Sequence, residues 1–379
     1  MSPLYQFEPD YAVHPGETLR ESLEDLQITP KEFAVRTGKP EQTISKILNG
    51  KSAITPDMAV QFEKVLNIPA KFWLDMQADY DEYIARQKQD EMKKAGGDWA
   101  RQFPYAQMAK AGWVKTTRKI EEKTDELLSF FNVSKPEAWE DIYIKQGLPA
   151  LFRASLKNDK NAYATSALLR YSEIASAGMD LPPYEKQKLK NLLPELKQIM
   201  VEAKSDFLQN IQQTCAGAGI VVVFTKHLDK TGIYGIVRWY KNKPVILMTD
   251  LRQRYDLFWF SFFHELGHLY LHGQKKNIFL EQELQADEKD QKEQEADDFA
   301  GKWLLTDKQF EMVKNIFYTE NTHPQKINAI KYYAQKFETH PAIIIGRLLR
   351  ENKALYKQGW VKYIPKVDFD RLLKNQNND

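Results

Sequence analysis

Residues 260–273 read Phe260-Ser261-Phe262-Phe263-His264-Glu265-Leu266-Gly267-His268-Leu269-Tyr270-Leu271-His272-Gly273, which places His-Glu-x-x-His inside a strongly apolar run. Residues four apart lie on one face of an α-helix, with Cβ atoms roughly 5–6 Å apart, so His264 and His268 can direct two imidazoles at one metal ion. Glu265 lies beside the first histidine, where it can reach a water on that metal. This arrangement is typical of zinc hydrolases. The alternative, a buried helix with two incidental histidines, is disfavoured because a glutamate buried without a metal is costly.

Length and charge limit the classes of protein that the sequence can encode. The chain has 379 residues, 42% of them hydrophobic, which is enough for two or three domains. Its 54 basic residues are balanced by 52 acidic ones, for a net charge of +2. This balance excludes binding to nucleic acid or to membranes through a global basic field.

Cysteine content and apolar runs predict the compartment. Cys215 is the only cysteine, which excludes an intramolecular disulfide and leaves histidine and carboxylate as the ligands for any zinc site. The first ten residues have neither the basic nor the apolar region of a signal peptide. The longest apolar run, Leu257–Phe263, is far too short to cross a membrane. We therefore expect a soluble, cytoplasmic protein with no membrane partner.

Residues 12–80 read as a set of short helices. Thr29, followed by a proline, starts one helix, and Gly38 ends it. A second helix covers Glu41–Leu48, and Thr55, again followed by a proline, starts a third. Two short helices joined by a short turn that contains glycine are the signature of a helix-turn-helix.

The second of these helices would enter the major groove of DNA. Residues 1–80 hold eight Lys and Arg against twelve Asp and Glu, but the segment 36–51 is locally positive, so DNA contact would rest on that face. The alternative is a helix-turn-helix used only for dimerisation or for binding a partner. The candidate DNA-binding residues are Gln42, Thr43, Ser45, Lys46 and Lys51.

The rest of the chain is predicted to be helical apart from one small sheet. Residues 86–214 read as a helical middle region that suggests no function. Apolar runs rich in β-branched residues then cover 220–224, 233–239 and 245–248, and they predict a three-stranded antiparallel sheet. We expect a mainly α fold with a small antiparallel β-sheet (α+β), with an N-terminal helix-turn-helix domain and a zincin-like C-terminal domain.

Zinc in a catalytic site needs a third protein ligand and an open position for water. The acidic stretch Glu281–Asp298 reads mostly as a solvated loop, and an amphipathic helix over 293–305 follows from its end. The candidate ligands there and on the first helix are Glu293, Glu295, Asp298 and His272. His272 would lie about 12 Å from His264 along the helix axis, too far to share one ion with both histidines. Periodicity does not decide between Glu293 and Glu295.

One histidine outside the motif also calls for an interpretation. His340 precedes a proline in an otherwise apolar segment. We interpret it as a packed or helix-capping residue rather than a catalytic one.

Three N-terminal stretches are specific enough to suggest a family: His14-Pro15-Gly16-Glu17, Thr43-Ile44-Ser45-Lys46-Ile47-Leu48-Asn49-Gly50-Lys51 and Phe72-Trp73-Leu74. Over about residues 10–85 the chain resembles HigA-type antitoxins of the Xre helix-turn-helix class. The resemblance implies a homodimer that binds double-stranded operator DNA, and a toxin as a protein partner. Pro40 stands where that family usually has Ser or a similar cap, which would remove a cap that contacts phosphate.

The C-terminal motifs suggest a second family. His264-Glu265-Leu266-Gly267-His268, Glu295-Ala296-Asp297 and His340-Pro341 resemble the ImmA/IrrE zinc metallopeptidases over about residues 215–350. The resemblance implies Zn²⁺ held by His264, His268 and Glu295, with Glu265 as the general base. Members of this family cleave repressors or antitoxins, so the resemblance implies a regulatory protease.

Together these expectations describe a regulator with two activities. We expect a helix-turn-helix domain at 1–85, a middle region at 86–214, a metallopeptidase domain at 215–350 and a tail at 351–379. The enzyme would control a toxin–antitoxin, stress or mobile-element operon by cleaving a regulator or itself, for example within Asp79–Gly97, with Val245–Met248 as an edge strand that holds the substrate. The alternative is an antitoxin-like repressor whose zinc domain is a sensor or scaffold.

Overall fold

The computed structural model describes residues 12–146, 162–229, 231–251, 253–273 and 286–370. The chain divides into two compact units, Met1–Gly97 with Ile120–Thr124, and Asp98–Lys119 with Asp125–Asp379. Each unit has a hydrophobic core of its own.

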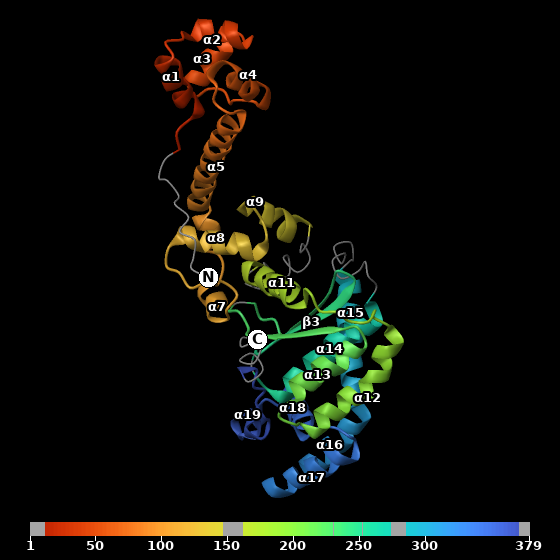
Figure 1. Cartoon of the computed structure of the whole chain (residues 1–379). Coiled ribbons are helices and arrows are strands. Elements are labelled where there is room, and N and C mark those ends of the chain that lie inside the picture. The colour runs from red at the N-terminus through yellow and green to blue at the C-terminus, as the bar shows by residue number, and fades with distance from the viewer. Residues whose placement is uncertain (1–11, 147–161, 230, 252, 274–285, 371–379) are drawn as a thin grey trace. The chain divides into compact units, whose positions relative to one another are not determined.

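The N-terminal unit is a bundle of short helices followed by a long one (Figure 1). Its elements are α1 (Pro15–Asp25), α2 (Pro30–Thr37), α3 (Glu41–Leu48), α4 (Pro56–Leu66) and α5 (Ala70–Ala95). The predicted boundaries of α2 are confirmed, because the Thr29 hydroxyl accepts a hydrogen bond from the Glu32 amide at 3.2 Å and Gly38 ends the helix at φ 66°. The core is made of side chains with no exposed surface: Leu19, Phe33, Ile44, Ile47, Ala59, Phe62 and Trp73.

Helix α5 continues through the charged segment 81–94, for which the sequence allowed either a solvated helix or a linker. It runs for 26 residues without a break. The buried Trp73 lies in its first turn, and many of its residues beyond Tyr80 are charged. The predicted domain boundary after residue 85 therefore falls inside a helix, and the compact unit extends to Gly97. Most of the segment Asp79–Gly97, which we expected to be a site of cleavage, is helical.

The second unit contains most of the helices and the only sheet among the described residues. Two helices, α6 (Gly97–Ala100) and α8 (Ile120–Phe131), begin with residues of the first unit and end with residues of the second. The other helices of the second unit are α7 (Tyr105–Lys110), α9 (Pro136–Trp139), a π-helix (Glu140–Gln146), α11 (Ala162–Ser176), α12 (Lys186–Glu202), α13 (Phe207–Gly217), α14 (Tyr255–His272), α15 (Ala286–Leu304), α16 (Asp307–Thr319), α17 (His323–Lys336), α18 (Pro341–Glu351), α19 (Ala354–Lys357) and a 3₁₀ helix (Trp360–Tyr363).

The sheet has three strands, as predicted, but their arrangement differs. Strands β1 (Val221–Thr225), β2 (Gly235–Tyr240) and β3 (Lys243–Thr249) lie in the order β1-β3-β2. A two-residue turn with positive φ at Lys241 and Asn242 joins β2 and β3 into an antiparallel hairpin. β1 then pairs with the free side of β3 in parallel, so the sheet is mixed rather than antiparallel. Val245–Met248 lies in the central strand, so its predicted edge position is wrong, and β2 is an edge strand.

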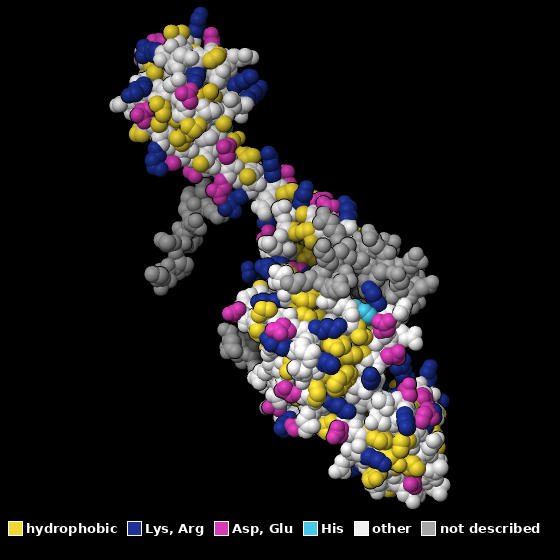
Figure 2. All heavy atoms as spheres, turned by 90° about the vertical axis from the view of Figure 1, so that its right-hand side faces the viewer, with side chains coloured by type: hydrophobic (Ala, Val, Ile, Leu, Met, Phe, Trp, Pro, Cys, Tyr) yellow, Lys and Arg dark blue, Asp and Glu magenta, His cyan; other side chains and the backbone are white. Residues whose placement is uncertain are grey.

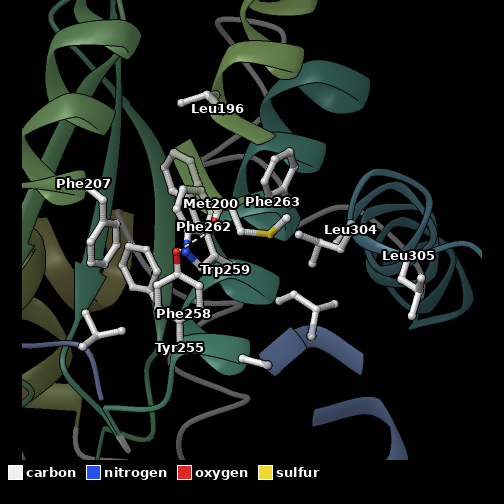
Figure 3. Close-up of a cluster of buried hydrophobic side chains, with 14 of the residues drawn as sticks. Leu196, Met200, Phe207, Tyr255, Phe258, Trp259, Phe262, Phe263, Leu304 and Leu305 are labelled. Carbon is white, nitrogen blue, oxygen red and sulfur yellow. Dashed lines mark hydrogen bonds between the residues drawn. The ribbon is translucent and has the colours of Figure 1, made fainter. Parts of the chain in front are cut away.

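Helix α14 forms the centre of the larger core. Trp259, Phe262, Phe263 and Leu266 have no exposed surface. Figure 3 shows the three aromatic residues of this set together with aromatic and aliphatic side chains from neighbouring helices. The hydroxyl of Tyr255, at the first turn of α14, donates to the Met200 carbonyl at 2.7 Å and ties α14 to α12. Apolar side chains are buried on every face of this helix except the one that carries His264, His268 and Leu271, and this burial holds the helix in place.

Helices α11, α12 and α13 of the predicted middle region pack with the peptidase-like part. The side chains of α12 and α13 belong to the same core as α14. Helix α11 is joined to the sheet by Arg238 of β2, which donates to Glu173 at 2.8 Å and to the Leu169 carbonyl at 3.3 Å. Glu173 also accepts a hydrogen bond from Arg170 at 2.8 Å. Because these charged groups are mostly buried, their pairing fixes α11 against β2.

The acidic stretch before α15 is also more ordered than predicted. Residues 286–298 are helical, as part of α15, whereas Glu281–Gln285 lie outside the described residues. None of the described helices combines the length and the apolar character that crossing a membrane requires.

Candidate metal centre and helix-turn-helix surface

Two helices bring three potential metal ligands together. His264 and His268 lie one turn apart on α14, with their Nε2 atoms 3.0 Å apart. Glu293 reaches them from α15, with carboxylate oxygens 3.3 Å from His264 Nε2 and 3.6 Å from His268 Nε2. These ligand atoms all lie within 4.8 Å of one another, and they are the only such group among the described residues.

The expected ligand Glu295 is placed elsewhere. Its Oε2 lies 3.4 Å from His272 Nε2, and its Oε1 accepts a hydrogen bond from Gln291 at 3.0 Å. Residues two apart differ by about 200° around a helix axis, so Glu293 and Glu295 cannot both face the same two histidines. Only the way α15 lies against α14 decides between them, and sequence periodicity does not contain that information. The placement of Glu295 with His264 and His268 is therefore corrected in favour of Glu293.

Asp297 is a member of the site that the sequence interpretation missed. Its Oδ1 lies 2.8 Å from Nδ1 of His264, so that nitrogen donates to the carboxylate and Nε2 keeps its lone pair free for a metal. Asp297 stands four residues after Glu293, which puts both carboxylates on one face of α15. That spacing was the available signal.

We expect Asp297→Asn to weaken zinc binding by about 10- to 100-fold, the usual effect of losing a carboxylate that orients a ligating histidine. Competition with a chelator of known affinity measures this. Asp298→Asn is the matched control, because the neighbouring side chain is exposed and should leave the affinity unchanged. Equal affinities for the two variants would contradict the orienting role of Asp297.

Small residues allow α14 and α15 to approach each other at the site. A Cβ on Gly267 would lie 3.2 Å from the Ala296 Cα and 3.3 Å from its carbonyl oxygen. Ala296 itself has no exposed surface. Gly267 and Ala296 therefore allow a short distance between α14 and α15. At this distance the carboxylate of Glu293 reaches the two histidines.

Glu265 faces the sheet rather than α15. It is 8% exposed, and it accepts a hydrogen bond from the backbone of Val237 on β2. A Cβ on Gly235 would lie 2.7 Å from the Glu265 Cγ, so only glycine lets β2 pass this close. Burial raises the pKa of Glu265, against the opposing charges of His268 and His264. The edge strand β2 and the predicted base are thus in direct contact.

The electrostatics of the three ligands suit a cation. Burial acts to lower the pKa of His264, but the hydrogen bond with Glu293 and the charges of Glu265, Glu293 and Asp297 outweigh it and raise that pKa to about 9. Hydrogen bonds with His264 and His268 lower the pKa of Glu293. Two imidazole nitrogens that face each other at 3.0 Å need a proton or a metal between them.

The donor set and its spacing fit zinc. Ligand atoms around a tetrahedral zinc lie roughly 3.3–3.5 Å from one another, given zinc–nitrogen distances of 2.0–2.1 Å. The observed separations are close to that spacing: 3.0 Å between the two nitrogens, 3.3 Å from His264 Nε2 to Oε2 of Glu293 and 3.6 Å from His268 Nε2 to Oε1 of the same carboxylate. Two histidines and a glutamate also form one of the known ligand sets of catalytic zinc, which leaves a fourth position for water or substrate.

The remaining histidine of interest has a structural role. Nδ1 of His340 accepts a hydrogen bond from the Ala342 amide at 3.1 Å, so His340 caps the N-terminus of α18. The interpretation of His340 as a capping residue is confirmed.

The helix-turn-helix surface is formed by α3. Gln42, Ser45, Lys46 and Lys51 are exposed, whereas Thr43 is half-buried. The helix begins after Pro40 with no side-chain cap, as the sequence predicted. Basic and acidic side chains are interspersed over the visible face of this unit (Figure 2). Within the segment 36–51, Lys39 pairs with Asp57 and Arg36 pairs with Glu32, which leaves Lys46 and Lys51 as its exposed cations without an ion pair among the described residues.

The fold and the two sites define a protein with an N-terminal helix-turn-helix and a second unit built around a His-Glu-x-x-His helix beside a small sheet. Residues 19–73 match the family model described as Helix-turn-helix. Residues 215–345 match the model of peptidase family M78, described as the IrrE N-terminal-like domain. The chain therefore belongs to the helix-turn-helix family through its N-terminal unit, and it carries an IrrE N-terminal-like domain. Both resemblances drawn from the sequence motifs are confirmed.

Two similar proteins each match less than a fifth of this chain. An uncharacterized HTH-type transcriptional regulator of Escherichia coli, YddM, is 36% identical over 63 residues, which are 17% of this chain and 67% of that protein. Virulence-associated protein A of Dichelobacter nodosus is 41% identical over 69 residues, 18% of this chain and 68% of that protein.

Solved structures are similar over a comparable share. A putative antidote protein of a plasmid maintenance system from Nostoc punctiforme has 36% identity and a TM-score of 0.21, covering 21% of this chain and 88% of that one. The Pseudomonas aeruginosa antitoxin HigA, solved with the higBA promoter, has 29% identity and a TM-score of 0.20, covering 21% of this chain and 86% of that one.

Proposed function

We propose that this protein is a DNA-binding regulator with a zinc-dependent endopeptidase activity. The observation that carries the proposal is the grouping of His264, His268 and Glu293 within 4.8 Å, next to a buried Glu265 that lies against β2. Zinc bound there would polarise a peptide carbonyl and make a water more acidic. A site of purely structural zinc would have no use for Glu265.

The residues of the chain have separate roles in peptide hydrolysis. Glu265 accepts the proton of the attacking water and passes it to the amine that leaves. Asp297 keeps the His264 ring in the orientation that presents Nε2. No strand among the described residues pairs with the outer edge of β2, and an extended peptide added there by main-chain hydrogen bonds would hold its scissile bond beside Glu265.

A separate regulatory protein is a better substrate than the chain itself. Strand addition requires an extended segment, whereas Asp79–Ala95 is part of α5. Cleavage there would first require that part of the helix to unfold. We therefore propose a repressor or antitoxin with an exposed extended segment as the substrate, and a stress, toxin–antitoxin or mobile-element operon as the context.

Incubation of zinc-loaded wild-type protein with the products of neighbouring genes, followed by mass spectrometry, tests this proposal. Cleavage of a partner by the wild type, but not by Glu265→Gln, supports it. Cleavage of the chain itself, with every partner intact, would establish self-cleavage instead. If no protein is cut with or without operator DNA, an antitoxin-like repressor that binds DNA and a toxin becomes the better account.

The helix-turn-helix unit is proposed to bind double-stranded operator DNA through α3, as a homodimer on a palindrome. We expect Lys46→Ala to weaken binding to a duplex from the protein's own promoter, and to lower the slope of log affinity against log salt by about one if Lys46 contacts a phosphate. Fluorescence anisotropy at several salt concentrations measures both quantities.

Lys64→Ala is the matched control for this prediction, because Lys64 is also exposed but lies on α4. Equal losses in the two variants would indicate a nonspecific charge effect. A wild-type protein without preference for its promoter over random DNA would favour a helix-turn-helix used for dimerisation or partner binding.

A further inference from the structure

An arginine lies about one helical turn away from the metal ligands. The face of α14 that carries the ligands continues towards the start of the helix, and its partly exposed side chains follow at helical spacing: Leu257, Phe260, His264, His268 and Leu271. The rings of Phe260 and His264 have centroids 6.4 Å apart. The guanidinium carbon of Arg350, in the last turn of α18, lies 5.8 Å from the centroid of the Phe260 ring.

The course of α18 along α14 brings Arg350 to this place. Gly346 of α18 lies against Asp256 of α14, so closely that a Cβ on this glycine would overlap the Asp256 carboxylate. Four residues further along each helix, Arg350 lies over Phe260. The two helices therefore run in the same direction here, and α18 approaches the turn of His264 before it ends at Glu351.

The guanidinium of Arg350 is placed to receive a carboxylate. Arg350 is exposed, and none of the described residues forms a hydrogen bond or an ion pair with it. The charged residues on either side along α18 do have partners, since Arg347 pairs with Asp307 and Glu351 lies 3.0 Å from Lys314. Contact with an aromatic ring restrains an arginine side chain but leaves its N–H groups able to bind a carboxylate in a fork.

A peptide on the outer edge of β2 would pass the turn that carries Phe260. Tyr234, which precedes β2, lines the same small cavity as Phe258 and Ser261, and Gly235 lies beside Glu265. The start of β2 is therefore directed towards the first half of α14. Phe258 is buried beneath the sheet, whereas Phe260 is on the partly exposed side of α14 from which a substrate must approach the metal ligands.

The direction and spacing of an added strand indicate which substrate residue lies near Arg350. Antiparallel pairing is the commoner arrangement between strands, and it would direct the C-terminal part of the peptide towards the start of β2. Phe260 lies about 6 Å before His264 along the helix axis, and an extended peptide advances about 3.3 Å per residue. The guanidinium would thus meet a side chain within about three residues after the cut bond.

We propose that Arg350 binds a carboxylate of the substrate, so that this protein prefers aspartate or glutamate among the three residues that follow the cut bond. The proposal rests on the endopeptidase function proposed above. Arg350 lies beyond residue 345, where the match to the IrrE N-terminal-like domain ends. The preference is therefore assigned to this chain rather than to the matched domain.

Peptides with an N-terminal hydroxamate test the preference without turnover, because the hydroxamate chelates zinc and the peptide extends to the side that follows the cut bond. Three pairs carry aspartate or asparagine at the first, second or third residue, and calorimetry on zinc-loaded wild-type protein gives their affinities. In one pair we expect the aspartate peptide to bind about fivefold more tightly, the scale of a well-formed exposed ion pair. The difference should shrink as salt rises. Equal affinities in all three pairs would overturn the proposal.

Substitutions at Arg350 should change the preference without changing zinc content. Arg350→Gln should remove it, Arg350→Lys should keep part of it, and Arg350→Glu should reverse it, so that a lysine peptide binds more tightly than the aspartate peptide. A purely structural role would not produce this reversal. Lys353→Gln is the matched control, because it removes an exposed positive charge just beyond the end of α18. Equal losses of preference in Arg350→Gln and Lys353→Gln would overturn the assignment to Arg350.

Cleavage of a mixed peptide library by zinc-loaded wild-type protein separates this inference from the function on which it rests. Cuts followed within three residues by aspartate or glutamate, more often than in the library as a whole, support the role of Arg350. Cuts without this preference overturn it but leave the endopeptidase function standing. If no peptide is cut and no hydroxamate peptide binds, the endopeptidase function fails, and the proposed role of Arg350 fails with it.

Discussion

Replacing Glu293 with alanine is expected to abolish stoichiometric zinc binding, whereas replacing Glu295 with alanine should leave one zinc per chain. The reason is geometric, because Glu293 carries the carboxylate within 3.3 and 3.6 Å of the two imidazole nitrogens and Glu295 is directed at His272. Elemental analysis of the dialysed proteins measures the metal content. His264→Ala should behave like Glu293→Ala.

The pair of variants gives a sharp comparison, since both remove one carboxylate from the same helix two residues apart. Circular dichroism of the metal-free proteins checks that α15 remains folded in each. Full zinc content in Glu293→Ala together with loss of zinc from Glu295→Ala would reverse the assignment and restore the ligand set implied by the family resemblance.

The second large effect is expected from Glu265→Gln. The substitution keeps the size of the side chain but removes the group that accepts a proton, so hydrolysis of a cleavable protein or peptide should fall by about 10²- to 10⁴-fold. Zinc content should stay at one per chain, because Glu265 faces β2 and is assigned no coordination. Initial rates of cleavage and elemental analysis on the same preparation measure the two quantities.

The outcome of Glu265→Gln separates chemistry from folding. Thermal unfolding should show a native-like transition, because glutamine can still accept the hydrogen bond from the Val237 backbone. Unchanged cleavage in this variant would mean that another group activates the water, and loss of zinc would mean that Glu265 contributes to coordination.

Local signals in the sequence predicted a large part of the structure. Thr29 and Gly38 mark the ends of α2 because capping and left-handed backbone depend on the residue itself. His264 and His268 could be paired because their spacing is fixed by the helix on which both lie. For the same reason, the exposure of Gln42 and Lys46 followed from the apolar pattern of α3.

The errors concern relations between elements. The sequence does not show whether Glu293 or Glu295 is the third metal ligand, because that depends on how α15 lies against α14. The parallel pairing of β1 with β3 depends on which side of the hairpin β1 joins, and three apolar runs do not determine that choice. The continuous helix α5 carries many charged residues, so it lacks the apolar stripe by which a helix is usually told from a linker.

One feature of α15 has a kinetic consequence. Glu293 and Asp297 stand one turn apart on this helix, so a single displacement of α15 from α14 withdraws both the carboxylate that contacts the two histidines and the carboxylate that orients one of them. Zinc escape would then follow the undocking of a whole helix rather than the breaking of one bond. The dissociation rate of zinc would then report how often α15 separates from α14. A protein that binds and stabilises or destabilises this helix would change the time for which zinc stays bound.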